Sequence, residues 1–96
     1  MDTKDTLSSK QRQSLKQQAH HLQPTVMVGH NGLTEAIVAE TDRSLNAHAL
    51  IKIRVQEDDR QVRETIFKTL CEQLDAQPVQ HIGKLLVLWR AKKEEK

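Results

Sequence analysis

The chain has 96 residues, 36% of them hydrophobic and 29% charged, and a formal net charge of +2. This length predicts a single domain over residues 1–96, with a core at about 7–91 and loose polar ends. We expect a cytoplasmic protein without membrane contact, because no apolar stretch approaches the ~20 residues of a membrane span and the N-terminus has no apolar signal segment.

The first predicted element is an amphipathic helix. Ser8 or Ser9 can cap its N-terminus, and the helix runs to about Leu22. Leu15, Ala19 and Leu22 are spaced i, i+4 and i+7, so they form one apolar stripe. A basic stripe with i, i+4 and i+8 spacing lies beside it and contains Arg12, Lys16 and His20.

A short strand and a second helix follow, joined by a corner with two glycines. The β-branched run at residues 25–28 predicts the strand, and the corner is Gly29-His30-Asn31-Gly32. Thr34 is the expected N-cap of a helix that ends at about Ala47. Its expected inner face contains Leu33, Ala36, Ile37, Thr41 and Leu45.

Residues 50–56 alternate between apolar and polar side chains, which predicts a second strand with one face in the core and one basic face. The apolar set is Ile51, Ile53 and Val55, and the basic set is Lys52 and Arg54.

The third helix has the strongest helical pattern in the chain. Asp58 or Asp59 can cap it, and Asp58 with Gln61 fits a capping box. The apolar stripe repeats every four residues, with Phe67 and Cys71 beside it, and contains Val62, Ile66, Leu70 and Leu74.

Two final strands, at residues 79–82 and 85–90, are joined by Gly83-Lys84, which suits a two-residue hairpin. Both faces of the last strand are apolar, which predicts a central or covered position. The fold class is therefore α/β, with element order α-β-α-β-α-β-β and a mixed four-stranded sheet with packed helices. We expect the strand–helix–strand crossovers to give parallel pairs, the second and third helices to share one face, and the first to cover part of the other.

The usual patterns of enzymatic chemistry are missing from the sequence. The five histidines show no metal-ligand spacing, and Cys71 lies in an apolar stripe rather than an exposed electropositive setting. The glycine corner is followed by Leu33-Thr34 rather than the Lys-Ser/Thr of a phosphate-binding Walker motif. A single cysteine also excludes an internal disulfide and fits a reducing compartment. We expect no catalytic site, no metal, no cofactor and no small-molecule substrate.

The glycine corner allows two interpretations. Its backbone N–H groups and the following helix N-terminus could hold a phosphate, because glycine has no side chain to keep a ligand away. Alternatively, it is a tight turn in which Asn31 and Gly32 adopt left-handed conformations.

The charges are segregated along the chain. Residues 6–34, 43–56 and 76–93 contain bases and no acids, so the folded molecule could have a basic side suited to a polyanion, although ordinary mixed surface charge is the alternative. Aromatic residues are limited to Phe67 and Trp89, which excludes base stacking on an aromatic platform. Nucleic-acid binding would depend on phosphates and shape.

Three motifs together resemble one known family. They are S-x-K-Q-x-x-x-L-K at residues 8–16, V-G-x-N-G-L-T-E at 28–35, and L-I-K-I-R-V with I-G-K-x-L-V-L-W-R at 50–55 and 82–90. They resemble the CRM domain (chloroplast RNA splicing and ribosome maturation) in its bacterial single-domain, YhbY-like form, over about residues 7–91.

The resemblance implies a fold similar to the C-terminal domain of translation initiation factor three. It also implies a non-enzymatic protein that binds RNA through its GxxG loop and is associated with precursors of the large ribosomal subunit. The loop residues are Gly29, His30, Asn31 and Gly32. From charge and position we add the bases Lys10, Arg12, Lys16, Lys52 and Arg54.

We expect a monomer with ribosomal RNA as its partner. The alternative is a protein-interaction module on the ribosome that uses the exposed sheet face or the third helix without direct RNA contact. A small enzyme acting on a phosphate ligand is a third possibility.

Overall fold

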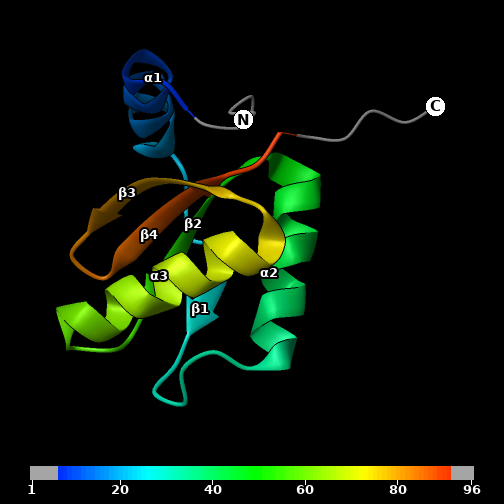
Figure 1. The fold of residues 1–96 in the computed structure, drawn as a ribbon, viewed down its shortest axis with the longest axis vertical. Helices are drawn as coiled ribbons and strands as arrows, with labels where there is room; N and C mark the ends of the chain where they lie inside the picture. Colours follow the sequence, from blue (N-terminus) through cyan, green and yellow to red (C-terminus); the bar gives the residue numbers. More distant parts are fainter. Residues whose placement is uncertain (1–6, 92–96) are drawn as a thin grey trace.

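The structure, a computed structural model, describes residues 7–91. Its elements follow the predicted order α-β-α-β-α-β-β (Figure 1). They are α1 (Ser9–Ala19), β1 (Val26–Val28), α2 (Glu35–His48), β2 (Leu50–Val55), α3 (Arg60–Leu74), β3 (Gln77–Ile82) and β4 (Leu85–Trp89).

The four strands form one mixed sheet in the order β1-β2-β4-β3. β1 pairs with β2 in parallel, and both pairs that involve β4 are antiparallel. The predicted central position of β4 is confirmed. Of the two expected parallel pairs, the pair of β1 with β2 forms. The pair of β2 with β3 does not form, because β4 lies between them, so this part of the expectation is wrong. β3 forms the edge instead and contains Pro78, which lacks the N–H that a central strand would need.

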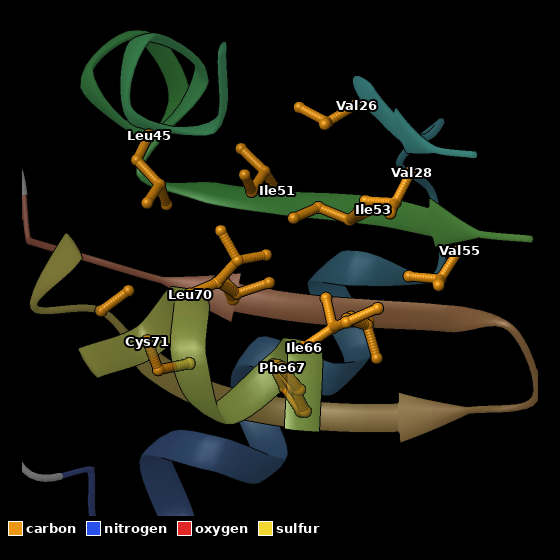
Figure 2. Close-up of a cluster of buried hydrophobic side chains, with 13 residues drawn as sticks. Val26, Val28, Leu45, Ile51, Ile53, Val55, Ile66, Phe67, Leu70 and Cys71 are labelled. Atoms are coloured by element: carbon orange, nitrogen blue, oxygen red, sulfur yellow. The ribbon is translucent and has the colours of Figure 1, made fainter. Parts of the chain in front are cut away.

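The main core lies between one sheet face and the helices α2 and α3, as predicted. Inward side chains alternate along the strands, so that Ile51, Ile53 and Val55 of β2 are all buried. Figure 2 shows these side chains directed toward those of Ile66 and Leu70 from α3. Cys71 is buried in the same cluster. Burial of such side chains stabilises the fold by roughly 25 cal/mol for each Å² of apolar surface removed from water.

A second, smaller cluster lies on the opposite sheet face beneath α1, also as predicted. Leu7, Ala19, Val79 and Val87 are its buried members, and the half-buried Leu15, Leu22, Leu50 and Trp89 pack against them. This cluster explains why both faces of β4 are apolar.

Two helix details differ from the expectations. α1 ends at Ala19 rather than about Leu22, although the Leu22 N–H still donates to the Ala19 carbonyl at 3.0 Å in a final turn. On α2, Ala36 is exposed and Val38 packs on the core instead. Residues spaced four apart on a helix differ in direction by about 40°, because the helix has 3.6 residues per turn. This rotation turns Val38 toward the core and Ala36 away from it.

The start of α3 also differs. Asp59 is the N-cap and accepts a hydrogen bond from the Gln61 N–H at 2.9 Å, so the capping box of Asp58 with Gln61 does not form. The Asp58 carboxylate binds the Lys84 ammonium at 2.6 Å instead. This ion pair connects the start of α3 to the β3–β4 hairpin.

Candidate nucleic-acid interface

The loop at residues 29–32 projects from the lower end of the molecule in Figure 1, between β1 and α2. It is a tight turn closed by the Gly32 N–H, which donates to the Gly29 carbonyl at 3.1 Å. His30 and Asn31 at its tip are exposed. Only Gly32 has a left-handed conformation, with φ +75°; the expectation that Asn31 would also adopt one is wrong. The turn is therefore accessible to a large ligand.

The two glycines of the loop differ in what they require. Gly32 needs its left-handed φ, which residues with a side chain rarely adopt. Gly29 has no positive φ, and a Cβ placed there would meet nothing within 4 Å. Neither backbone conformation nor packing among the described residues accounts for glycine at position 29. Close approach by an external group is a physical reason that would account for it.

The loop leads directly into the N-terminus of α2. Thr34 is the N-cap, as predicted, and its hydroxyl accepts a hydrogen bond from the Ile37 N–H at 3.2 Å. The positive end of the α2 dipole therefore lies beside the loop, and Glu35 occupies the first helical turn. The Gly32 and Ile37 N–H groups already have partners, so the remaining amides of the turn and of this helix end are those that suit an anion approaching from the loop side.

The predicted strand bases lie close to this corner. Arg54 on β2 is directly opposite Met27 on β1, two residues before Gly29. Arg54 is exposed and Lys52, two residues earlier on the same face, is half-buried. The structure thus places Arg54 near the loop and Lys52 two residues farther from it along β2.

The predicted bases of α1 lie farther away. Figure 1 shows α1 at the end of the molecule opposite to the loop. Lys10 is exposed, Lys16 is half-buried, and the half-buried Arg12 donates from Nε to the Pro78 carbonyl at 3.3 Å. These bases share a sheet face with Lys52 and Arg54, because α1 covers that face.

The charges of the folded chain are divided between two sides. α1 and β2 contain bases, and neither α1 nor any of the four strands contains an acid, so the α1 side of the sheet is free of acidic residues within the part of the chain that the structure describes. All acids of residues 7–91 lie on α2, α3 and the connections beside α3. They are Glu35, Glu40, Asp42, Glu57, Asp58, Asp59, Glu64, Glu72 and Asp75. These nine acids outnumber the four bases of α2 and α3, which are Arg43, Arg60, Arg63 and Lys68, so we call the α1 side the basic side and the other the acidic side.

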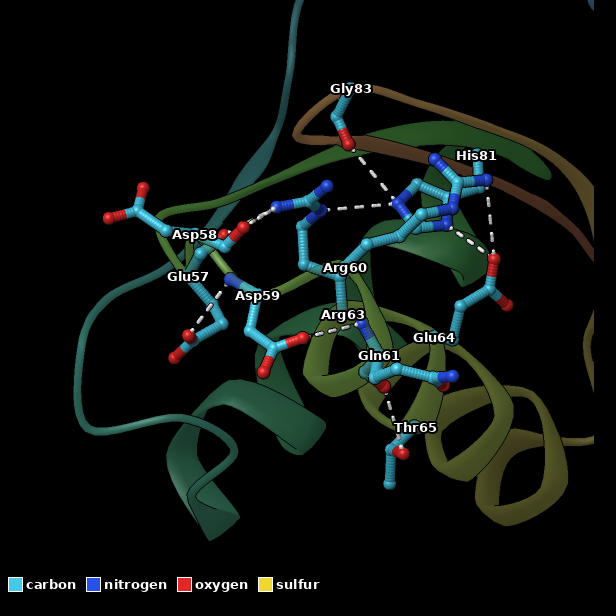
Figure 3. Close-up of polar contacts among 10 residues, drawn as sticks. All are labelled: Glu57, Asp58, Asp59, Arg60, Gln61, Arg63, Glu64, Thr65, His81 and Gly83. Atoms are coloured by element: carbon cyan, nitrogen blue, oxygen red, sulfur yellow. Dashed lines mark hydrogen bonds and ion pairs between the residues drawn. The ribbon is translucent and has the colours of Figure 1, made fainter.

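A buried arginine that the sequence reasoning missed holds the connection before α3. Arg63 donates from Nη1 to the carbonyls of Glu57 (2.7 Å) and Asp58 (2.9 Å), and from Nε to His81 Nε2 at 3.2 Å (Figure 3). His81 Nδ1 also contacts the Glu64 carboxylate at 2.8 Å. Helical spacing could have revealed Arg63, because it lies three residues before the buried Ile66 on the same stripe.

This connection borders the glycine loop. The hydrogen bond from Lys84 and then its charge lower the pKa of the Asp58 carboxyl, and a smaller lowering comes from the charge of His30. The Gln56 N–H donates to the Val28 carbonyl at 2.8 Å, so the start of this connection lies beside the loop. The Lys84 ammonium offsets the Asp58 charge beside the loop, which limits its repulsion of an approaching anion.

The described residues show little sign of other chemistry. Within residues 7–91, no three His, Cys, Asp or Glu side chains are grouped as metal ligands, and no helix of that range is long and apolar enough to cross a membrane. Burial, and to a smaller extent the charge of Glu72, raises the pKa of the Cys71 thiol to about 12. Cys71 therefore lacks the thiolate that a nucleophile needs at neutral pH.

Comparison with known proteins gives consistent matches. Residues 7–90 match the family model of the CRS1 / YhbY (CRM) domain. An RNA-binding protein of Haemophilus influenzae is 48% identical over 91 residues, which cover 95% of this chain and 92% of the relative. A probable RNA-binding protein of Pseudomonas aeruginosa is 39% identical over 84 residues, 88% of this chain and 81% of the relative.

A solved structure has a similar fold. The solution structure of a hypothetical protein of Staphylococcus aureus, proposed to bind RNA, matches with a TM-score of 0.83 and 31% sequence identity. The match covers 94% of both chains.

Proposed function

The chain belongs to the CRS1 / YhbY (CRM) domain family, and from this membership we propose that it is a monomeric, non-enzymatic RNA-binding protein. Its partner is ribosomal RNA in precursors of the large subunit, and its role is to assist their assembly. The relatives named as RNA-binding proteins support the general function. The role in large-subunit assembly comes from the family resemblance of the sequence.

The observation that carries the proposal is the unoccupied space around Gly29. A Cβ there would meet no atom of the protein within 4 Å, although the backbone conformation does not require glycine. A side-chain-free position lets a phosphate reach the backbone amides of the loop and the α2 N-terminus. The loop residues Gly29, His30, Asn31 and Gly32 form this contact.

The acid-free side of the sheet supplies the attraction. Arg54 lies near the loop and Lys52 follows it along β2, and the α1 bases extend the positive side toward the far end of the molecule; they are Lys10, Arg12 and Lys16. Such a surface attracts a phosphate backbone through counterion release, independently of sequence. An RNA strand that begins at the loop can follow this side toward α1.

The experiment is a salt titration of binding to naked ribosomal RNA. For Lys52→Gln with Arg54→Gln, we expect weaker binding and a log–log salt slope that is shallower by about 0.7 for each lost phosphate contact on a single strand. The matched control is Arg43→Gln with Lys68→Gln, which removes two bases from α2 and α3 and should leave the slope unchanged. Equal slopes in all three proteins would reject the strand bases as phosphate contacts.

One observation favours a second candidate, a protein-interaction module on the ribosome. The acidic side has a hollow of about 730 Å³ between α2 and α3, with Leu33, Val38 and Leu74 among its apolar lining and Glu35 and Asp42 among its acids. A basic protein segment would suit it. Binding to naked ribosomal RNA separates the candidates, because only the first requires it.

A further inference from the structure

Four side chains form a row across the uncovered end of the sheet. The strand register places Met27 opposite Arg54, Arg54 opposite Leu85, and Leu85 opposite Ile82. The strand neighbours of Met27, Arg54 and Leu85 lie in the main core, and His81, next to Ile82, contacts Arg63 of α3. All four side chains of the row therefore point away from the main core. We refer to Met27, Arg54, Leu85 and Ile82 as the loop-end row.

The loop-end row is unusually apolar for an exposed surface. Met27 is 55% exposed and Ile82 is 49% exposed, and within residues 7–91 only Val62 on α3, at 40%, is another large hydrophobic residue with such exposure. The helix α1 packs on the other half of this face, over Val87 and Trp89, and leaves the loop-end row open. The two exposed apolar side chains lie at the ends of the row, with Arg54 and the half-buried Leu85 between them. Exposed apolar side chains placed on both sides of a cation indicate a binding surface.

The surroundings of the loop-end row indicate the ligand. Met27 is two residues from Gly29, and Arg54 lies in the middle of the row with Lys52 on the same face. No acid is present on this face among the described residues. The row combines apolar side chains with a guanidinium and adjoins the proposed phosphate-binding loop. It therefore suits a ligand group that is flat, apolar on its faces and attached to phosphate. A nucleobase has these properties.

We propose that the loop-end row binds the bases of single-stranded RNA whose phosphates contact the glycine loop, so that the protein selects single strands over duplexes. This inference rests on the proposed function. Neighbouring strands are about 4.8 Å apart, so four strands span roughly 14 Å. A four-stranded sheet of another RNA-binding fold holds two or three bases across a similar width with aromatic side chains, whereas here the apolar side chains and the Arg54 guanidinium take that role. Duplex RNA keeps its base faces stacked and cannot use the row.

The test measures fluorescence anisotropy with three ligands of equal length: a single-stranded RNA, the same strand without bases, and a duplex. The variant is Met27→Thr with Ile82→Thr, since threonine suits strands and both positions are exposed. The matched control is Val62→Thr, which alters an exposed hydrophobic residue on the acidic side. Circular dichroism confirms that each variant is folded.

We expect the wild type to bind the single strand about tenfold more tightly than the strand without bases. The variant should lose most of this difference, with an unchanged salt slope, while Val62→Thr should retain it. In the wild type, NMR shifts of the amides of Met27, Arg54, Leu85 and Ile82 should respond to the strand with bases and much less to the strand without bases. This second measurement does not depend on the folding of a variant.

Several results would overturn the inference. A wild type that binds the strands with and without bases equally well would reject base binding but leave the proposed function intact. A folded variant with Met27→Thr and Ile82→Thr that still prefers the strand with bases would also reject base binding and leave the proposed function intact. A variant that binds RNA normally but no longer binds precursor particles would assign the row to a protein partner. A wild type that binds no RNA would reject the proposed function itself.

Discussion

Gly29 and Gly32 both lack a side chain, but for different reasons. Gly32 has φ +75°, where an L residue loses roughly 1–2 kcal/mol, so its identity is explained by the turn itself. Gly29 has neither this conformation nor a neighbour that a side chain would displace. At the scale of single residues, Gly29 is therefore the position that an external ligand explains best.

The direction of side chains on the strands could be predicted from the sequence, because period-two alternation determines it. Lys52 and Arg54 point away from the core as expected. Arg63 was harder to predict, because helical spacing places it beside the buried Ile66 but a charged residue is normally exposed. Its burial depends on carbonyls of Glu57 and Asp58, which only the folded connection brings within reach.

Cys71 gives a prediction about pH. Its pKa rises from 9.0 in an unfolded chain to about 12 in the fold, so between these values the folded chain retains a proton that the unfolded chain releases. The stabilising contribution is complete below pH 9.0 and is lost as pH rises toward 12. In urea unfolding above pH 9.0, the wild type should lose more stability than Cys71→Ala. The same loss in both proteins would show that Cys71 has no such role.

The order and type of the helices and strands could be predicted because each has a clear period and capping residues. The position of β4 between β2 and β3 was only partly predictable. The apolar character of both β4 faces indicated a central strand, but which strands flank it depends on how the hairpin folds back. Pro78 could have indicated an edge strand, but the prediction started β3 at Val79 and so left Pro78 outside it.

The junction between α2 and β2 gives a prediction at this scale. Ala49 alone connects the two elements and has φ 65° and ψ −49°, a conformation unfavourable for a residue with a side chain. Ala49→Gly should relieve this strain and raise the unfolding free energy by about 1 kcal/mol, measured by urea denaturation. The control is Ala39→Gly on the exposed part of α2, which should lower it by roughly 0.5–1 kcal/mol. A loss of stability in both variants would contradict the strain at Ala49.

At the scale of the whole molecule, the fold converts a linear segregation of charge into two sides. The acid-free segments become α1 and the sheet, and the acid-rich segments become α2, α3 and their connections. The sequence predicted this arrangement only as one of two alternatives, because sidedness depends on which sheet face each helix covers. A polyanion would approach the α1 side and be repelled from the other.

The central claim is that an RNA phosphate backbone contacts the bare loop between β1 and α2. The most direct test is the affinity of Gly29→Asp with Gly32→Asp for ribosomal RNA, compared with Ala39→Asp and Gln73→Asp, which add the same charge on exposed sites of α2 and α3. The account predicts that the loop variant remains folded and loses RNA binding, while the control variant keeps it. A folded loop variant with wild-type affinity would contradict the account.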